Sequence, residues 1–184
     1  WTDNPARGWS GVIGKNKTGI LFTPEYKRIS TFYNWFDHHG ATVEWRFAPL
    51  NVNYGDSFTT SFIIQPFQGL DEISGAGGGV AGAVSFPAKE KVEITLTAVE
   101  KKIVKVEAEW IAEGKKDSVK LPGGKTLELN PDTPVAFEIP LSGMKTGNLF
   151  RVVLRDANGN FLADLLKPVG TENRKFVFMP LEKR

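Results

Sequence analysis

A period of two in the hydrophobic pattern constrains the second half of this chain more than any other feature. Apolar and polar side chains alternate over residues 92–98, 104–110 and 135–141. Successive side chains of a β-strand point to opposite faces, so this alternation predicts strands with one buried and one exposed face. Apolar stretches also flank Asn158-Gly159, a pair that tolerates the positive φ of a tight hairpin. Residues 87–184 are therefore predicted to form an immunoglobulin-like β-sandwich.

The first half is also predicted to be β-rich, although its pattern is less regular. Residues 43–47 alternate as a strand does, a turn is expected at 53–56, and a second strand is expected over 58–64, ending before Pro66. No window carries a helical period with caps at both ends, so at most one helical turn is expected, near residues 24–27. The predicted fold class is all-β, with an antiparallel β-sandwich architecture of two packed units.

Composition changes near residue 86 and suggests two domains, residues 1–86 and 87–184. The first segment holds 15 of the 21 aromatic residues and is interpreted as an aromatic-rich β segment that needs a further element to complete its sheet. Between the two lies a glycine run, residues 75–83. Because glycines offer little side chain to pack, we interpret this run as a flexible connector or as a long loop inside one sandwich.

Several classes of function are disfavoured by composition. A net charge of +2 argues against a nucleic-acid binder, and the chain has no cysteine for thiol chemistry or zinc. No apolar run approaches the ~20 residues of a membrane span. The glycine run matches a dinucleotide-binding pattern, but Pro87 follows too soon for the required helix, so no cofactor is expected. Abundant Lys and Glu without Cys fits a heat-adapted source.

The residues from Trp45-Arg46-Phe47-Ala48-Pro49-Leu50 through the turn at 53–56 to Pro66-Phe67-Gln68-Gly69-Leu70 resemble a known family. They are similar to the closing strand pair of galactose-mutarotase-like supersandwich domains, which occur in carbohydrate-active proteins. The second segment resembles immunoglobulin-like or fibronectin-like modules in architecture. The resemblance implies a carbohydrate-linked, exported, multi-module context, and hence an extracellular or cell-envelope location.

Five residues are candidates for ligand contact. Indoles beside small polar groups, as at Trp9 and Trp35, either stack on a sugar ring or are buried in the core. His38 and His39 either form a solvated turn or serve in metal or acid–base chemistry. Arg46, on one strand face with Glu44, completes the candidate set.

These observations predict a non-catalytic accessory module of a carbohydrate-active or cell-envelope protein, with a carbohydrate or a neighbouring protein module as partner. Two alternatives stay open. One is a structural or self-association module of a surface assembly. The other is an epimerase or glycosidase fragment, which would need a carboxylate pair drawn from Glu25, Asp37, Glu44 and Asp56 or a histidine beside one of them.

Overall fold

The computed structural model describes residues 2–3, 8–37, 40–88, 90–112, 115–119, 125–131, 133–140 and 148–169. Over these residues the protein is all-β, every strand pair is antiparallel, and the only helical element is the 3-10 turn η1 (Tyr26–Arg28). The strands are β1 (Thr2–Asp3), β2 (Ser10–Ile13), β3 (Thr18–Pro24), β4 (Ile29–Asp37), β5 (Gly40–Phe47), β6 (Phe62–Gln68), β7 (Gly75–Gly77), β8 (Val80–Ala88), β9 (Lys91–Ala98), β10 (Lys102–Ala112), β11 (Lys115–Val119), β12 (Thr126–Leu129), β13 (Val135–Pro140), β14 (Leu149–Asp156) and β15 (Phe161–Pro168). The predicted fold class is confirmed.

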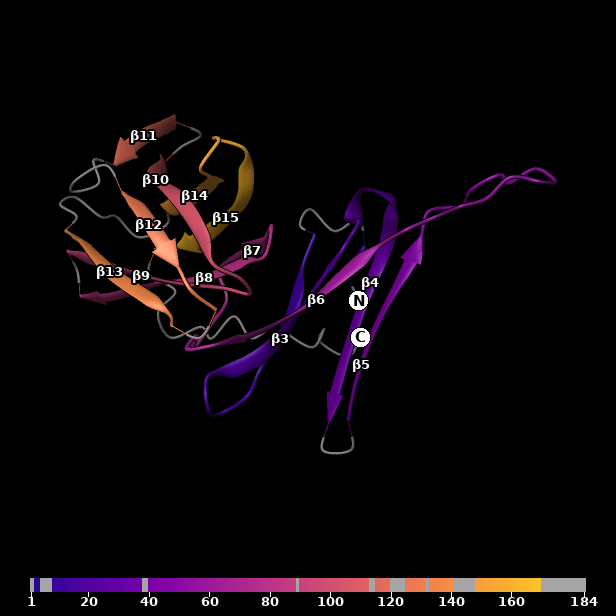
Figure 1. The fold of residues 1–184 in the computed structure, drawn as a ribbon, viewed down its shortest axis with the longest axis horizontal. Helices are drawn as coiled ribbons and strands as arrows, with labels where there is room; N and C mark the ends of the chain where they lie inside the picture. The colour runs from indigo at the N-terminus through magenta and orange to yellow at the C-terminus, as the bar shows by residue number, and fades with distance from the viewer. Residues whose placement is uncertain are drawn as a thin grey trace.

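Strands β7 to β15 form a two-layer sandwich, on the left in Figure 1. One sheet has the order β13-β9-β8-β7 and the other the order β11-β10-β14-β15, with β12 paired to β10. In β9 the alternating residues Val92, Ile94 and Leu96 are fully buried between the sheets, as the period of two predicts. The hairpin of β14 and β15 turns at Asn158-Gly159, and Gly159 has the expected positive φ of 89°. The sequence pattern thus located most strands of the sandwich.

The smaller unit, on the right in Figure 1, consists of two three-stranded sheets with the orders β2-β3-β6 and β1-β4-β5. Trp45 of β5 joins them, since its ring centroid lies 5.1 Å from that of Phe62 on β6 and 6.3 Å from that of Phe32 on β4. The alternation over residues 43–47 therefore places the Trp45 indole on the inward face of β5.

The glycine run is a β-hairpin, so its interpretation as a flexible connector or long loop is wrong. Residues 75–77 form β7, Gly78 and Gly79 turn with φ of 57° and 77°, and β8 begins at Val80. Such positive φ values favour glycine because it lacks a Cβ. A Cβ on Gly75 would lie 1.9 Å from the backbone oxygen of Asp164 in β15, so glycine is also required by the close approach of two strands.

Strand β8 is buried on both faces and forms a wall shared by two cores. Val80 and Val84 pack into the sandwich, whereas Ala81 and Ala83 pack into a second cluster with Leu21, Phe67, Leu70 and Ile73. The small side chains of this stretch let the β2-β3-β6 sheet approach closely. Residue 86, where the two predicted domains meet, lies inside this strand.

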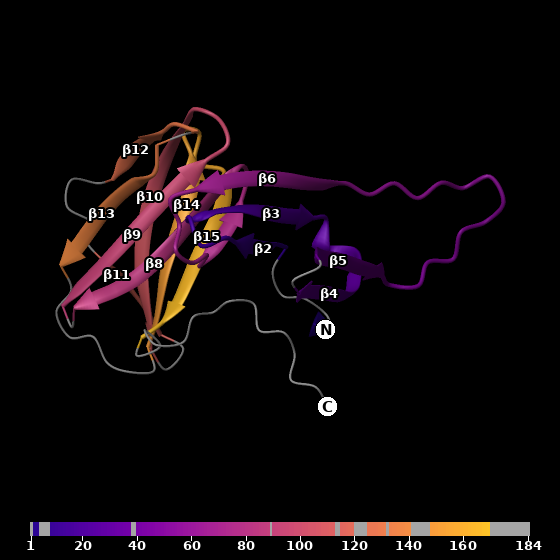
Figure 2. The same cartoon turned by 90° about the horizontal axis from the view of Figure 1, so that it is seen from below.

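Residues 48–61 form a long projection between β5 and β6, which we call the arm; Figures 1 and 2 show it extending well beyond the sheets. The turn at 53–56 is confirmed at its tip by the hydrogen bond from the amide of Asp56 to the carbonyl of Asn53, 3.0 Å. The expected strand over 58–64 is confirmed only for residues 62–64, because β6 begins at Phe62, and its expected end before Pro66 is wrong, because β6 continues through Pro66 to Gln68. Proline is tolerated there because β6 lies at the edge of its sheet.

Candidate functional site

The outer face of the β4–β5 hairpin carries two of the predicted ligand residues. Trp35 pairs with Thr42, Tyr33 with Glu44 and Thr31 with Arg46, so all six residues point to the same face. Trp35 is 43% exposed. Four residues separate the rows of Trp35 and Arg46, which places them about 13 Å apart along the hairpin. These two residues therefore share a flat, open face rather than a cavity.

The two histidines lie outside the described residues. His38 and His39 fall between the end of β4 at Asp37 and the start of β5 at Gly40, and their predicted roles stay untested. Within the described ranges, no three acidic or histidine side chains gather closely enough to hold a metal ion.

Trp9 lies on a different part of the molecule from Trp35. It is half-buried and packs against the second core cluster, beside Ile13 and Ala76. It also lines a pocket of about 450 Å³, which we call the Trp9 pocket. The Trp9 indole therefore contacts the core and also borders a pocket that a ligand could enter.

Both units contribute to the Trp9 pocket. The smaller unit supplies Trp9, Glu25 and Lys27, and the sandwich supplies Phe161 and Asp164. Phe161 is 56% exposed at the start of β15. Backbone from the turn of the glycine run completes the lining. The pocket therefore combines two aromatic rings with two carboxylates and one ammonium group.

An ion-pair network fixes one wall of this pocket. Arg151 Nε donates to Asp164 Oδ2 over 3.2 Å, and Arg151 Nη1 donates to Glu109 Oε1 over 2.8 Å. Burial lowers the pKa of Arg151, but the hydrogen bond to Glu109 and the charges of Asp164 and Glu109 outweigh it, so the pKa lies above its usual value. Asp164 is thereby held in place by a permanently charged guanidinium.

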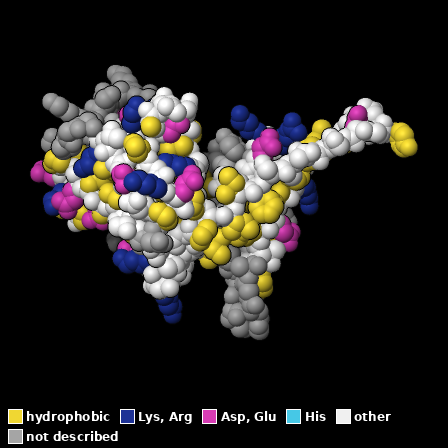
Figure 3. Space-filling view, viewed as in Figure 1, with side chains coloured by type: hydrophobic (Ala, Val, Ile, Leu, Met, Phe, Trp, Pro, Cys, Tyr) yellow, Lys and Arg dark blue, Asp and Glu magenta, His cyan; other side chains and the backbone are white. Residues whose placement is uncertain are grey.

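A second concavity has a different chemistry. A groove of about 1050 Å³ runs over the outer face of β3 and β6, and we call it the apolar groove. Ile20, Phe22, Ile64 and Pro66 form its floor, and Val99 of the sandwich lies at one side. Figure 3 shows hydrophobic side chains gathered in this region, between the two units. No charged residue lines the groove.

Sequence reasoning found only part of these sites. It selected Trp9 but missed Phe161 and Asp164, since nothing in the local pattern of β15 connects it with a residue near the start of the chain. A signal for the groove was present, because Phe62, Ile63 and Ile64 are three consecutive apolar residues, which a half-buried strand does not need.

The fold and the two concavities define an antiparallel all-β sandwich protein with two concave surfaces of different chemistry. No protein-family model matches this chain, and no curated protein matches it. Among solved structures the chain is similar to a Niemann-Pick type C2 protein from Japanese carpenter ant, with 10% sequence identity and a TM-score of 0.31 over 55% of this chain and 96% of that chain. The fold class rests on the strands and sheets of the chain itself. Among the described residues, no helix is long and apolar enough to cross a membrane.

Proposed function

We propose that this chain is a non-catalytic, carbohydrate-binding accessory module of a carbohydrate-active or cell-envelope protein, and that its sugar occupies the Trp9 pocket. The observation that carries the proposal is the pairing of two aromatic residues, Trp9 and Phe161, with Glu25 and Asp164 around one cavity. A volume of about 450 Å³ lies within the ~300–1,000 Å³ usual for small-molecule sites.

The chemistry of the pocket suits a sugar better than other ligands. A pyranose ring presents C–H groups that stack on aromatic faces, and hydroxyls that donate to carboxylates. A wholly apolar ligand would desolvate Glu25, Lys27 and Asp164 without replacing their hydrogen bonds. The preferred ligand is therefore a neutral oligosaccharide.

The carbohydrate-linked, extracellular setting draws on the resemblance of residues 45–70 to the closing strands of galactose-mutarotase-like supersandwich domains. It is part of the proposal, together with the immunoglobulin-like or fibronectin-like character of the second segment. Its support is that residues 45–70 contain the end of β5, the arm with its turn, and β6, so two consecutive strands are connected through a turn.

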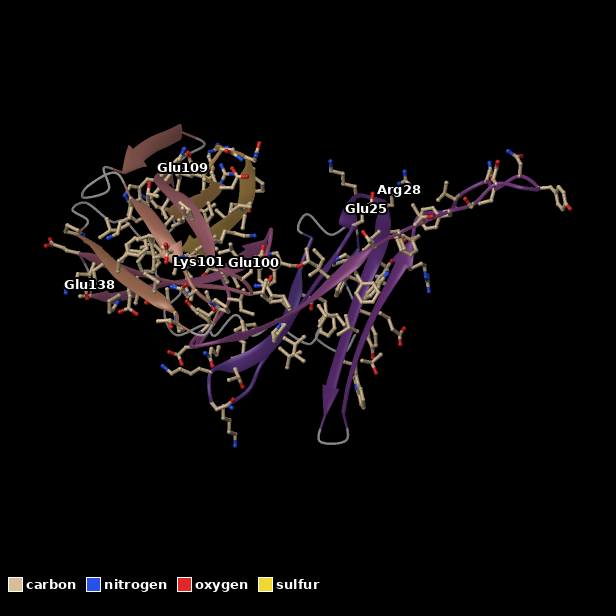
Figure 4. All side chains as sticks on the ribbon, in the orientation of Figure 1. Glu25, Arg28, Glu100, Lys101, Glu109 and Glu138 are labelled. Atoms are coloured by element: carbon tan, nitrogen blue, oxygen red, sulfur yellow. The ribbon has the colours of Figure 1, made fainter. Side chains whose placement is uncertain are left out.

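Among the described side chains, the positions of Glu25, Glu44 and Asp56 disfavour the carboxylate pair of the catalytic alternative. Glu25 lines the Trp9 pocket, Glu44 lies on the outer face of β5, and Asp56 lies at the tip of the arm. Figure 4 shows Glu25 beside Arg28 in the smaller unit, away from Glu109 in the sandwich. The second carboxylate of the pocket, Asp164, is engaged by Arg151, whereas a glycosidase needs two carboxyl groups available to its substrate.

Isothermal titration with a panel of neutral oligosaccharides tests the proposal. Phe161→Ala removes a ring that is largely exposed, so the fold should survive, and we expect the dissociation constant to rise about tenfold, as loss of one aromatic contact implies. Trp35→Ala is the matched control, because it removes an exposed indole from another surface and should leave binding unchanged.

Two outcomes would contradict the proposal. If no saccharide of the panel binds, the carbohydrate-binding function is wrong. If Trp35→Ala abolishes binding and Phe161→Ala does not, the sugar contacts the outer face of the β4–β5 hairpin and the assignment to the Trp9 pocket is wrong.

A further inference from the structure

We infer that the protein self-associates by arm exchange: the arm of one copy lies in the apolar groove of a second copy, along the free edge of β6. This contact involves neither the Trp9 pocket nor the outer face of the β4–β5 hairpin. It is therefore independent of carbohydrate binding.

The apolar groove and the adjoining residues of β6 have the exposed apolar side chains of an interface that lacks its partner. The side chains of Phe62, Ile63 and Ile64 are all about half exposed, although they are consecutive and thus point to both faces of β6. Exposed apolar groups in a contiguous patch mark contact sites, because burying them releases water from apolar surface. The groove is lined without charged residues, so it would receive an apolar segment without desolvating a charge.

Strand β6 also offers backbone hydrogen bonds. It is the last strand of the order β2-β3-β6, paired with β3 along one edge and with no other strand among the described residues. A free, apolar edge strand is a template for an added strand, which would satisfy its unpaired C=O groups and the unpaired N–H groups of its residues other than Pro66. The groove therefore favours an extended chain rather than a helix.

The arm has the pattern of a strand that lacks its partner. Leu50, Val52 and Tyr54 are exposed and alternate with Asn51 and Asn53. This is the period of two that a strand shows when one of its faces is covered. Within its own copy the arm projects away from the sheets, as both ribbon views show.

The arm is held in this projecting conformation at its base and tip. At the base, the rings of Phe47 and Phe58 pack edge to face with centroids 5.2 Å apart, and the guanidinium of Arg28 lies 5.6 Å from the Phe58 ring centre. At the tip, the amide of Asn53 donates to Asp56 Oδ2 over 3.0 Å. Preorganisation of this kind lowers the entropy lost when the arm binds.

The dimensions of arm and groove agree. Each limb of the arm has seven residues, 48–54 and 55–61, and extends at most about 23–25 Å. Strand β6 also has seven residues, which span about 23 Å. The apolar side chains of the ascending limb repeat every two residues, as do Ile64 and Pro66 on the groove floor, so the rows match in spacing.

Three single variants test the exchange by sedimentation equilibrium across a wide range of concentrations. Val52→Asp places a charge on the arm and Ile64→Asp places one in the groove, and each should weaken self-association at least about tenfold, since a carboxylate would be buried without a partner. Ile103→Asp is the control, because Ile103 is a strand isoleucine of similar exposure, 47% against 55%, on β10 of the sandwich. It should associate as the wild type does. Circular dichroism and thermal melting establish that each variant is folded.

Mixing identifies the geometry of the contact. In an equimolar mixture the intact arm of the Ile64→Asp copy meets the intact groove of the Val52→Asp copy, so the mixture should associate more tightly than either variant alone. A wild type that is monomeric at every concentration overturns the inference. So does self-association that Ile64→Asp weakens and Val52→Asp leaves unchanged, because that result means that grooves pack face to face without the arm.

Discussion

The turn between β14 and β15 depends on the carboxylate of one residue. Asp156 Oδ1 accepts hydrogen bonds from the amides of Asn158 and Asn160 over 2.9 and 2.8 Å, and Oδ2 accepts one from Asn160 Nδ2 over 2.8 Å. These bonds favour the ionised carboxylate. The side-chain bond of Asn160 has the largest effect, and together with the backbone bonds it lowers the pKa of Asp156 below the ordinary value of 3.8.

A lowered pKa predicts a pH-dependent contribution to stability. Because the folded state binds the proton of Asp156 less tightly than the unfolded state does, the stabilisation is complete well above pH 3.8 and is lost as the pH falls through 3.8 toward the folded pKa. Asp156→Asn keeps an acceptor oxygen but does not titrate. We therefore expect the melting temperature of the wild type to exceed that of Asp156→Asn near neutral pH, and the difference to shrink below pH 4. A difference that is constant with pH would contradict this role of the carboxylate.

At the scale of the strand, the sequence predicted elements where one periodic signal decides the structure. The alternation in β9, β10 and β13 located each strand because one face contacts the sandwich core and the other contacts solvent. The interpretation of the glycine run as a connector or loop was wrong because residues 80–84 of β8 are buried on both faces, so this stretch has no alternation of polar residues that would mark a strand. The predicted strand end before Pro66 was wrong because a proline is excluded only from strands with partners on both sides.

Gly75 offers a test of the close packing of β7 on β15. A Cβ at this position would lie 1.9 Å from the Asp164 oxygen and 2.8 Å from its carbonyl carbon, which are backbone atoms that a rotamer change cannot move. Gly75→Ala should therefore reduce the free energy of unfolding by about 3 kcal/mol, the upper range for overpacking, as measured by urea denaturation.

Gly14→Ala is the matched control for this prediction. Gly14 is exposed, and the nearest atom to an added Cβ is Asn16 Oδ1 at 3.0 Å, an exposed side-chain atom that needs to shift by only a few tenths of an ångström. The change in unfolding free energy should stay within about 0.5 kcal/mol. Equal losses in the two variants would mean that backbone entropy rather than the contact with β15 sets the effect.

At the scale of the whole molecule, the candidate sites lie where the two units meet, and this is why local pattern could not reveal them. Trp9 and Phe161 border one pocket although most of the chain separates them. Alternation reports which face of a strand is buried, but it carries no information on which strands become neighbours. Single indoles could be selected from the sequence as candidate ligand contacts, whereas the residues that lie beside them in the folded protein could not.

An ion pair joins the sandwich to the segment that connects the two units. Lys167 of β15 donates its ammonium group to Glu72 Oε2, in the segment between β6 and β7. The side chain of Lys167 is only 6% exposed and that of Glu72 is 22% exposed. Removing one partner of a buried pair leaves the other charge without compensation, which costs more than the pair itself contributes.

A double-mutant cycle on this pair tests whether it couples the units. Lys167→Met should lower the free energy of unfolding by about 2–3 kcal/mol, less than the ~3–5 kcal/mol of a fully buried pair because Glu72 retains some access to water. Lys167→Met combined with Glu72→Leu removes both charges, so about 1 kcal/mol or more of that loss should return. Urea denaturation followed by circular dichroism measures the four free energies. Strictly additive effects would mean that the two charges act independently, and that the shared strand β8 and its second core hold the units together without this pair.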